Sequence, residues 1–304
     1  MDRIDIFKSV DMRENEPLSR HSTIQIGGPA KYVLFPKDSG ELVSVITECN
    51  NKNIRYRVIG NASNVLFDDR GFDGAVIFTA DINDVEYTHR NNSCFVKVGC
   101  GRSLTEIASQ TGKKHCLSGL EFAYGIPGTL GGAVFMNAGA YGGQMSDIVV
   151  ETEYLNTKTG EISVLNASEH KFSYRHSIFT DHPEYVILSS TLELKKGDPE
   201  EIFAKMSQNM QARKDKQPLD MPNAGSTFKR PAANVFAGKL IEDAGLKGYA
   251  VGGAQISTKH AGFTVNCGGA TSADVRALID HVKEAVSSAY NVELEAEIIY
   301  VPYN

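Results

Sequence analysis

The first candidate for chemistry in this sequence is a serine that is followed closely by two basic residues. Ser226 follows Gly225 and is followed closely by Lys229 and Arg230. A hydroxyl in such a cationic setting can donate a proton in a phosphate-rich site. The surrounding sequence is not GxSxG, so a hydrolase nucleophile is not indicated. A purely structural serine is the alternative interpretation of the same segment.

Ionisable side chains that could take part in chemistry occur in two further segments. Arg175 lies in a polar cluster after an apolar stretch, where a solvated loop residue is an equally good interpretation. Glu293, Glu295 and Glu297 alternate along a predicted terminal strand, residues 292–300, and share its polar face. This alternation cannot show which of the glutamates, if any, takes part in chemistry. The alternative is that all three lie on a solvated strand edge.

A run of glycines predicts a place where the backbone itself binds a ligand. The segment 118–143 holds eight glycines, and ordering each of them costs conformational entropy. Gly125 and Gly128 are typical of a sharp turn, and the bare amides of such a turn can hold an anion. Interleaved apolar residues such as Ile126 and Leu130 make a flexible linker the weaker interpretation.

A second small-residue turn follows a predicted strand. The segment from Gly60 to Asn64 reads Gly-Asn-Ala-Ser-Asn, whereas the dinucleotide fingerprint GxGxxG needs glycine at the positions of Ala62 and Val65. A Rossmann assignment is therefore rejected. The turn can still hold a diphosphate through its backbone amides, and a structural turn is the alternative.

Strand-like and helix-like segments alternate around these turns. The predicted elements are strands over 32–35, 57–60, 75–79 and 186–194, hairpins over 85–98 and 148–165, and helices over 41–49, 104–111 and 198–214. A capping box at Thr271 and Asp274 precedes a further helix with an apolar stripe. This mixture predicts an α+β fold with a break near residue 200.

The composition limits the class of protein. A formal net charge of −6 argues against a broad nucleic-acid surface. No apolar run approaches the length of a membrane span, and the N-terminus lacks a secretory hydrophobic region. The five cysteines are scattered, with neither a CxxC pair nor a zinc ligand set. We therefore expect a cytoplasmic protein with free thiols and no metal centre.

Taken together, these segments resemble the UDP-N-acetylenolpyruvoylglucosamine reductase family, the flavoenzymes that complete UDP-N-acetylmuramate for bacterial peptidoglycan. The resemblance covers nearly the whole chain. It runs in order through TIQIGGPAKY, VIGNASNVLFDDRGFDGAVI, SGLEFAYGIPGTLGGAVFMNAGAYG, FSYRHSIF, KQPLDMPNAGSTFKRP, AGKLIEDAGLKGYAVGGAQIS, KHAGFTVN and LEAEI. The spacing between YRHS and GSTF leaves no room for the insertion of the family's longer form, so the chain resembles the compact form.

The resemblance implies a fold, cofactors and a set of binding residues. It implies an FAD-binding domain of the vanillyl-alcohol oxidase type over residues 1–200, with two α+β lobes that divide near 70–75, and an α+β substrate-binding domain over 201–304. It implies FAD and NADPH as cofactors, an enolpyruvyl sugar nucleotide as substrate, and a monomer. The residues implied to contact FAD are Gly60, Asn61, Ala62, Ser63, Asn64, Gly125, Ile126, Pro127, Gly128, Gly131, Gly132, Asn137, Ala138 and Gly139. Those implied to contact substrate are Tyr141, Arg230 and Lys247.

The same resemblance implies catalytic roles for three side chains. NADPH would reduce FAD, and flavin N5 would then pass hydride to C3 of the enolpyruvyl group. Arg175 matches the arginine of the family's YRxS, and Glu297 matches the glutamate of its last strand; both are implied to stabilise the enolate. Ser226 matches the serine of GSxF and is implied to protonate C2.

Four positions depart from the family pattern. Gln25 and Ile299 stand where family members usually have arginine, and Asn61 and Ala62 stand where they usually have glycine. A backbone position with positive φ tolerates asparagine better than alanine. Two alternatives stay open at this point. One is a flavin oxidase of the same fold, for which His115 lies just upstream of the glycine run, and the other is a flavin- or sugar-nucleotide-binding protein without turnover.

Overall fold

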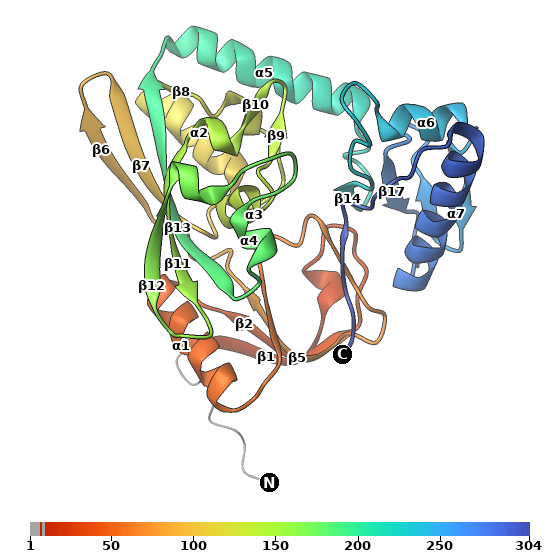
Figure 1. Cartoon of the computed structure of the whole chain (residues 1–304), viewed down its shortest axis with the longest axis horizontal. Helices are drawn as coiled ribbons and strands as arrows, with labels where there is room; N and C mark the ends of the chain where they lie inside the picture. Colours follow the sequence, from red (N-terminus) through yellow and green to blue (C-terminus); the bar gives the residue numbers. More distant parts are fainter. Residues whose placement is uncertain (1–6, 8–9) are drawn as a thin grey trace. The chain divides into compact units, whose positions relative to one another are not determined.

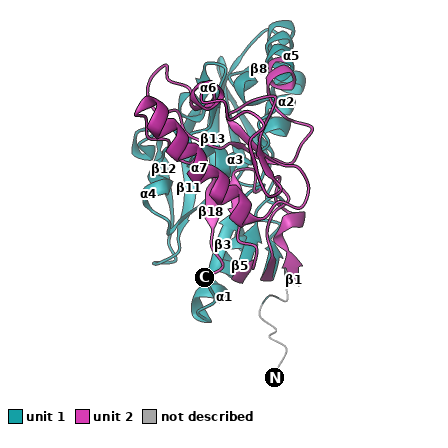
Figure 2. Ribbon diagram, turned by 90° about the vertical axis from the view of Figure 1, so that its right-hand side faces the viewer, with its two compact units in different colours: residues 1–13, 32–61, 74–211 teal, residues 14–31, 62–73, 212–304 magenta. Residues whose placement is uncertain are grey.

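The computed structural model describes Phe7 and residues 10–304, and these residues form two compact units. Unit 1 contains Phe7 and residues 10–13, 32–61 and 74–211, and unit 2 contains residues 14–31, 62–73 and 212–304, as coloured in Figure 2. The chain passes between the units at several points. One lies in the turn after Gly60, and the others lie inside β1 (Asp11–Pro17), β2 (Pro29–Phe35), β5 (Phe72–Phe78) and α5 (Pro199–Lys216).

This division differs from the predicted boundary near residue 200. Unit 2 begins its C-terminal segment at Ala212 and also contains residues 14–31 and 62–73. The reason is long-range pairing inside unit 2, where β4 (Val65–Phe67) runs parallel to β18 (Ile299–Val301). The assignment of FAD to residues 1–200 and of substrate to 201–304 stays a prediction.

Two sheets and their helices account for most of residues 10–211. The first sheet has the order β1–β2–β5–β3, and β3 (Tyr56–Ile59) is parallel to β5. Helix α1 (Ser39–Asn51) begins where the Asp38 side chain accepts a hydrogen bond from Glu41 N at 2.8 Å. Its buried face consists of Leu42, Val45, Ile46 and Cys49.

The second sheet is six-stranded and lies within unit 1 (Figure 1). Its strands, in spatial order, are β12 (Ile162–Asn166), β11 (Val149–Asn156), β13 (Tyr185–Lys196), β7 (Ser93–Gly99) and β6 (Val85–Arg90), with β8 (Leu117–Ser118) also paired to β13. The remaining elements of unit 1 are α2 (Leu104–His115), η3 (Glu121–Ala123), α3 (Leu130–Phe135), β9 (Gly139–Ala140), β10 (Gly143–Gln144), η4 (Met145–Asp147), η5 (Ala167–His170) and α4 (Ile178–Asp181). Residues from both sheets and these helices form one hydrophobic core.

Unit 2 has its own sheet and core. The sheet has the order β14 (Asn223–Ser226), β17 (Phe263–Asn266), β16 (Ala254–Ile256) and β15 (Ala250–Val251). Its helices are η2 (Leu18–Arg20), α6 (Ala237–Asp243) and α7 (Ser272–Tyr290). The predicted capping box is confirmed, since Thr271 Oγ1 and Asp274 Oδ2 each accept the other residue's backbone N–H at 3.0 Å. The predicted α+β class is also confirmed.

The prediction of one continuous strand over residues 292–300 is wrong. Ala296 pairs with Phe228 in an antiparallel bridge, whereas Ile299 begins the parallel pairing of β18 with β4. The segment changes partner between these two residues, so the alternation of apolar and acidic residues does not correspond to one strand. Leu294 and Ile298 are nevertheless buried, as the alternation predicted.

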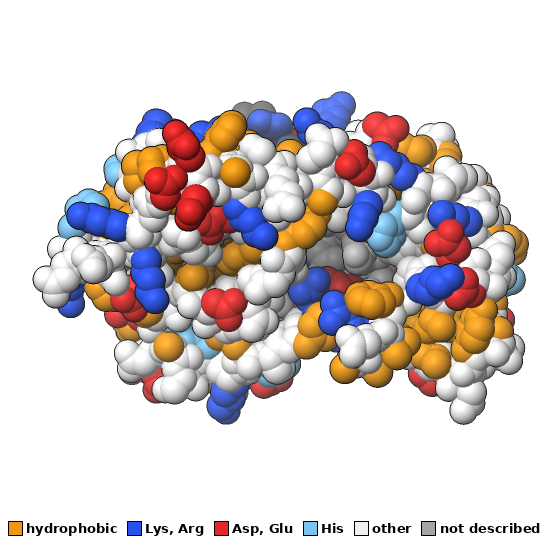
Figure 3. All heavy atoms as spheres, turned by 90° about the horizontal axis from the view of Figure 1, so that it is seen from above, with side chains coloured by type: hydrophobic (Ala, Val, Ile, Leu, Met, Phe, Trp, Pro, Cys, Tyr) orange, Lys and Arg blue, Asp and Glu red, His pale blue; other side chains and the backbone are white. Residues whose placement is uncertain are grey.

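The described surface carries charges of both signs. On the face drawn in Figure 3, basic and acidic side chains are intermingled. No helix among the described residues has the length and apolar character needed to cross a bilayer. In the same part of the chain, no group of three or more His, Cys, Asp or Glu residues is placed to hold a metal ion.

A fully buried histidine connects η5 to the six-stranded sheet. His170 Nδ1 donates to the Asn166 carbonyl at 2.9 Å, and Nε2 accepts from the Thr152 hydroxyl at 2.8 Å. Burial lowers the pKa of His170, because it disfavours the charged ring. The folded state therefore keeps this ring neutral at a pH where the unfolded chain, with a histidine pKa of about 6.5, takes up a proton.

We expect this difference to destabilise the protein as the pH falls below about 6.5, because the unfolded state then binds a proton that the folded state does not. The check is the thermal unfolding midpoint of the wild type and of His170→Gln between about pH 7.5 and pH 5.5. The wild type should lose more stability across this range than the variant. The exposed His89→Gln is the matched control and should follow the wild type. Equal pH slopes for all three proteins would contradict the assignment.

Candidate functional site

In unit 1 the two small-residue turns lie against each other. A Cβ atom added to Gly60 would lie 2.2 Å from Thr129 Oγ1. One residue later, Asn61 Nδ2 donates to the Pro127 carbonyl at 2.6 Å. The approach is possible only because residue 60 has no side chain. The segments around residues 60 and 128 are far apart in the sequence. Their backbones nevertheless come close together at Gly60, where no side chain separates them.

The glycine run is a packed turn rather than a linker. Gly131 N donates to the Cys100 carbonyl at 2.8 Å, and a Cβ on Gly131 would lie 3.0 Å from the Cys100 Cβ. Thr105 Oγ1 accepts from Gly125 N at 3.1 Å and donates to the Ile126 carbonyl at 3.0 Å. Burial raises the pKa of the Cys100 thiol to about 12, so this neighbour of the turn stays uncharged.

Several backbone donors in these turns have no partner among the residues that the structure describes. They are the N–H groups of Asn61, Gly128 and Thr129 in unit 1 and those of Ala62, Ser63 and Asn64 in unit 2. Successive unpaired amides of this kind are suited to an anion such as a phosphate. The arrangement agrees with the chemistry expected from the sequence for both turns.

Four of the predicted site residues have a left-handed backbone although they are not glycine. Their φ angles are +44° at Ala62, +42° at Asn137, +50° at Tyr141 and +55° at Arg175. This conformation costs a residue with a side chain roughly 1–2 kcal/mol and persists only where the surroundings impose it. Such positions concentrate at functional sites.

Arg175 lies in a tight turn of unit 1. Ser173 N donates to the His176 carbonyl at 3.1 Å, and His176 N donates to the Ser173 carbonyl at 3.2 Å. The guanidinium carbon of Arg175 is 5.1 Å from the centre of the Tyr174 ring. Ser177 Oγ donates to the Phe135 carbonyl at 2.7 Å, which ties the turn to the end of α3.

In unit 2 the structure brings Ser226 and Glu297 onto neighbouring segments. Glu297 N donates to the carbonyl of Thr227, the residue after Ser226, at 2.8 Å. On its other side, the Glu297 carbonyl accepts a hydrogen bond from Asn64 Nδ2 at 3.1 Å. Asn64 also accepts from Ile299 N at 2.9 Å through its own carbonyl. The backbone of Glu297 is therefore held between two predicted site segments.

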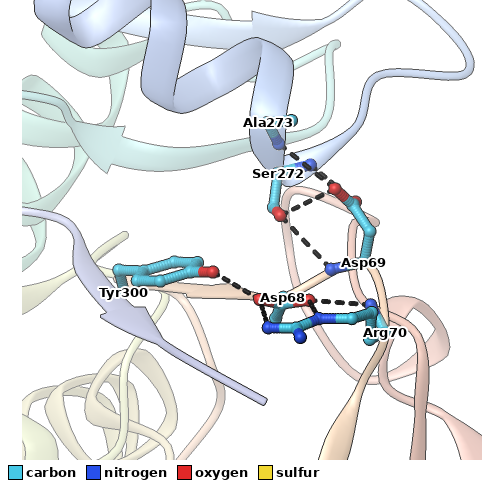
Figure 4. A network of polar contacts seen from close by, with 6 residues as sticks. All are labelled: Asp68, Asp69, Arg70, Ser272, Ala273 and Tyr300. Atoms are coloured by element: carbon cyan, nitrogen blue, oxygen red, sulfur yellow. Dashed lines mark hydrogen bonds and ion pairs between the residues drawn. The ribbon is translucent and has the colours of Figure 1, made fainter. Parts of the chain in front are cut away.

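A polar network fixes the strand that follows Glu297 (Figure 4). The Tyr300 hydroxyl donates to Asp68 at 2.5 Å, and Arg70 Nε and Nη2 each donate to Asp68 at 3.1 Å. The hydrogen bonds from Arg70, and then that from Tyr300, hold the pKa of Asp68 well below its usual range. The adjacent Asp69 carboxylate accepts from Ser272 N at 2.6 Å at the start of α7. The β4–β18 pair is thus anchored beside Glu297.

The two predicted substrate-binding cations already have partners within unit 2. The guanidinium carbon of Arg230 is 4.9 Å from the centre of the Phe236 ring. Lys247 Nζ lies 2.9 Å from Glu242 Oε1, with both side chains at least one third exposed. Exposed ion pairs of this kind are worth little, so Lys247 can exchange its partner for an anionic ligand at small cost.

Sequence reasoning missed the threonines that shape the glycine run. Thr129 caps α3 by accepting from Gly132 N at 3.4 Å and also faces Gly60. A threonine directly before an apolar helix is an N-cap signature that could have revealed the first role. No pattern in the neighbouring sequence could have predicted the contacts of Thr105 or the hydrogen bond between Asn64 and Glu297. His115, the candidate for covalent flavin attachment, stacks on Tyr87 with ring centres 4.0 Å apart.

Comparison with known proteins identifies relatives over nearly the whole chain. Family models described as "FAD binding domain" and "UDP-N-acetylenolpyruvoylglucosamine reductase, C-terminal domain" match residues 30–166 and 217–301. A UDP-N-acetylenolpyruvoylglucosamine reductase of Lachnoclostridium phytofermentans is 47% identical over 93% of this chain and 91% of its own. One of Caldanaerobacter subterraneus is 44% identical over 97% and 95%. The crystal structure of the Thermus caldophilus reductase superimposes with a TM-score of 0.78 at 33% identity, covering 96% of this chain and 99% of that one.

We expect Gly60→Ala to weaken flavin binding by about 10-fold or more, because overpacking of this kind costs roughly 1–3 kcal/mol. The measurement is the visible flavin absorbance of the purified protein and its change on flavin titration. The double variant Gly60→Ala/Thr129→Ala removes the atom that the new Cβ would meet 2.2 Å away, so it should recover part of the lost binding. Unchanged flavin content in Gly60→Ala would show that the close approach is not part of a flavin site.

We expect Ala62→Gly to stabilise unit 2 by about 1 kcal/mol, because glycine adopts positive φ without the penalty that alanine pays. Urea unfolding followed by circular dichroism measures the change. The matched control is Ala277→Gly on the exposed face of α7, which should lower stability by about 1 kcal/mol. A loss of stability in both variants would mean that the methyl group of Ala62 contributes more than its backbone costs.

Proposed function

The chain belongs to the UDP-N-acetylenolpyruvoylglucosamine reductase family, and from that membership we propose that it is an active, NADPH-dependent reductase. As a member of this family it is an FAD-dependent oxidoreductase of peptidoglycan precursor synthesis. The proposed reaction reduces the enolpyruvyl group of UDP-N-acetylglucosamine-enolpyruvate and yields UDP-N-acetylmuramate. The observation that carries the proposal is the family match over nearly the whole chain. The sequence also has Ser226, Arg175 and Glu297 in segments that resemble the family's motifs.

The turns of unit 1 fit the diphosphate of FAD. A Cβ at Gly60 would fill the space beside Thr129, and the amides of Asn61, Gly128 and Thr129 are open for an anion in the described chain. We assign the diphosphate to the turns Gly60–Asn64 and Gly125–Gly132, with Ala138 and Gly139 nearby. FAD bound there would supply the redox chemistry, that is, transfer of hydride from NADPH to C3 of the substrate.

Three side chains complete the reduction. Addition of hydride at C3 leaves negative charge at C2 that spreads into the substrate carboxylate as an enolate. The Arg175 guanidinium and the Glu297 carboxyl group, in its protonated form, stabilise this charge, and preorganised groups of this kind usually supply the largest part of catalysis. The Ser226 hydroxyl donates its proton to C2, which completes the saturated lactyl ether.

The substrate is held by its anionic groups. Arg230 and Lys247 are the proposed contacts for its diphosphate, and Tyr141, which is 41% exposed, is a further contact. Lys247 can release its exposed partner, Glu242, to do so. We place the reaction in the cytoplasm and the protein as a monomer, as parts of the same proposal.

The role of Ser226 predicts an asymmetric defect. Ser226→Ala should leave flavin reduction by NADPH close to normal and slow flavin reoxidation by the enolpyruvyl substrate about 10²- to 10⁴-fold, the usual range for general acid catalysis. Stopped-flow absorbance of the flavin measures each half-reaction separately. Ser288→Ala, on the exposed face of α7, is the matched control and should change neither rate. Equal loss of both half-reactions in Ser226→Ala would contradict the role of proton donor.

A further inference from the structure

The turn that carries Arg175 has a conformation that its own sequence does not favour. Ser173 and His176 close the turn with their two mutual backbone hydrogen bonds, so Arg175 is the third of its four residues. With φ at +55°, this position has the geometry at which a type II turn favours glycine. An arginine stays there only when neighbouring groups hold the turn closed.

Two tethers join this turn to the end of the glycine run, one on each side of Arg175. On the N-terminal side, Asn137 Nδ2 donates to the Ser173 carbonyl at 3.0 Å. On the C-terminal side, Ser177 Oγ donates to the Phe135 carbonyl at 2.7 Å. Both partners lie within three residues of each other at the end of α3, so the turn is fixed to the segment that follows the proposed FAD contacts.

Asn137 is suited to this task in three ways. Its side chain is 97% buried, since only 3% of the residue is exposed. Its amide is used at both ends, because Oδ1 accepts from Ser146 N at 2.9 Å while Nδ2 donates to Ser173. Its φ of +42° is one that asparagine tolerates better than most residues. Both ends of the amide are thus bonded within the protein.

We propose that Asn137 is a positioning residue for Arg175. Its amide couples the end of the glycine run to the arginine turn and so sets where the guanidinium meets the substrate enolate. The inference rests on the proposed function, because it requires that Arg175 stabilise that enolate. It reassigns the side chain of Asn137 from the predicted flavin contact to support of a catalytic group.

The variant Asn137→Asp tests the donor alone. Aspartate has the same shape and keeps an acceptor for Ser146 N, but it presents an oxygen to the Ser173 carbonyl instead of an N–H group. In the FAD-loaded protein we expect reoxidation by substrate to slow about 10- to 100-fold, the cost of a displaced catalytic group. Flavin content and flavin reduction by NADPH should stay within about two-fold of the wild type.

Asn156→Asp is the matched control for the added charge. Asn156 Oδ1 only accepts hydrogen bonds, from Lys158 N at 3.0 Å and Thr159 N at 3.4 Å, so a carboxylate serves equally well there. Neither half-reaction should change in this variant. If Asn137→Asp fails to fold, Asn137→Ser replaces it, because a serine hydroxyl cannot reach both partners and the same pattern is expected.

A second measurement, cleavage by trypsin, does not depend on catalytic turnover. Trypsin cleaves after Arg175 only when the turn opens, and cleavage of a transiently open segment follows its open population. Asn137→Asp should raise the rate of cleavage after Arg175 by about 10-fold or more, as followed by the masses of the two fragments. Cleavage after Lys158, at the exposed end of the β11–β12 hairpin, is the reference within the same digest and should not change.

The variant Arg175→Ala separates failure of this inference from failure of the proposed function. If it slows reoxidation and adding Asn137→Asp slows it no further, the two residues act as one unit and the inference is supported. If Arg175→Ala slows reoxidation but Asn137→Asp changes neither reoxidation nor cleavage after Arg175, the inference is overturned and the proposed function stands. An additive loss, or equal loss of both half-reactions in Asn137→Asp, also overturns it. No effect of Arg175→Ala on reoxidation refutes the proposed role of Arg175 and the inference with it.

Discussion

The contact of Gly60 with Thr129 is the constraint on which the proposed cofactor site depends. Two turns from different parts of unit 1 approach so closely that one hydrogen atom replaces a side chain at their meeting point. The side-chain amide of Asn61 also donates to the Pro127 carbonyl in the second turn. A polypeptide that uses main-chain amides as ligands must keep side chains away from them, which explains why this part of the chain is rich in glycine.

The same need for bare, sharply turned backbone extends to residues that are not glycine. Ala62, Tyr141 and Arg175 all have positive φ angles, and each lies in or near a predicted site segment. Isolated turns of these sequences would prefer other conformations. At Arg175 the turn is held by hydrogen bonds from the side chains of Asn137 and Ser177. Strain at the functional residues is thus balanced by ordinary packing and hydrogen bonding one layer away.

In unit 2 the decisive feature is a change of strand partner around Glu297. Residues before it pair with the segment that follows Ser226, and residues after it pair with β4, which follows Asn64. The glutamate therefore sits where two pairings meet, and its backbone is bonded from both sides. Asp68 and Tyr300 secure the second pairing a few residues further on. A side chain at such a junction has little freedom to shift along its strand.

Local patterns in the sequence were sufficient for the parts of the structure that depend on a few neighbouring residues. The capping box of α7, its buried stripe, the β6–β7 hairpin and the sharp turns at Gly60 and Gly125 all follow from short-range propensity and periodicity. The choice of Glu297 as the proposed catalytic glutamate came from resemblance to a family, because periodicity treats Glu293, Glu295 and Glu297 alike.

Contacts between distant segments required the folded chain. The placement of residues 14–31 and 62–73 in unit 2, the meeting of Gly60 with Thr129 and the split of the terminal strand at Ala296 were not predicted. Capping and periodicity report only on residues within a turn or two of each other, whereas strand pairing and close backbone approach depend on which surfaces the whole chain buries together.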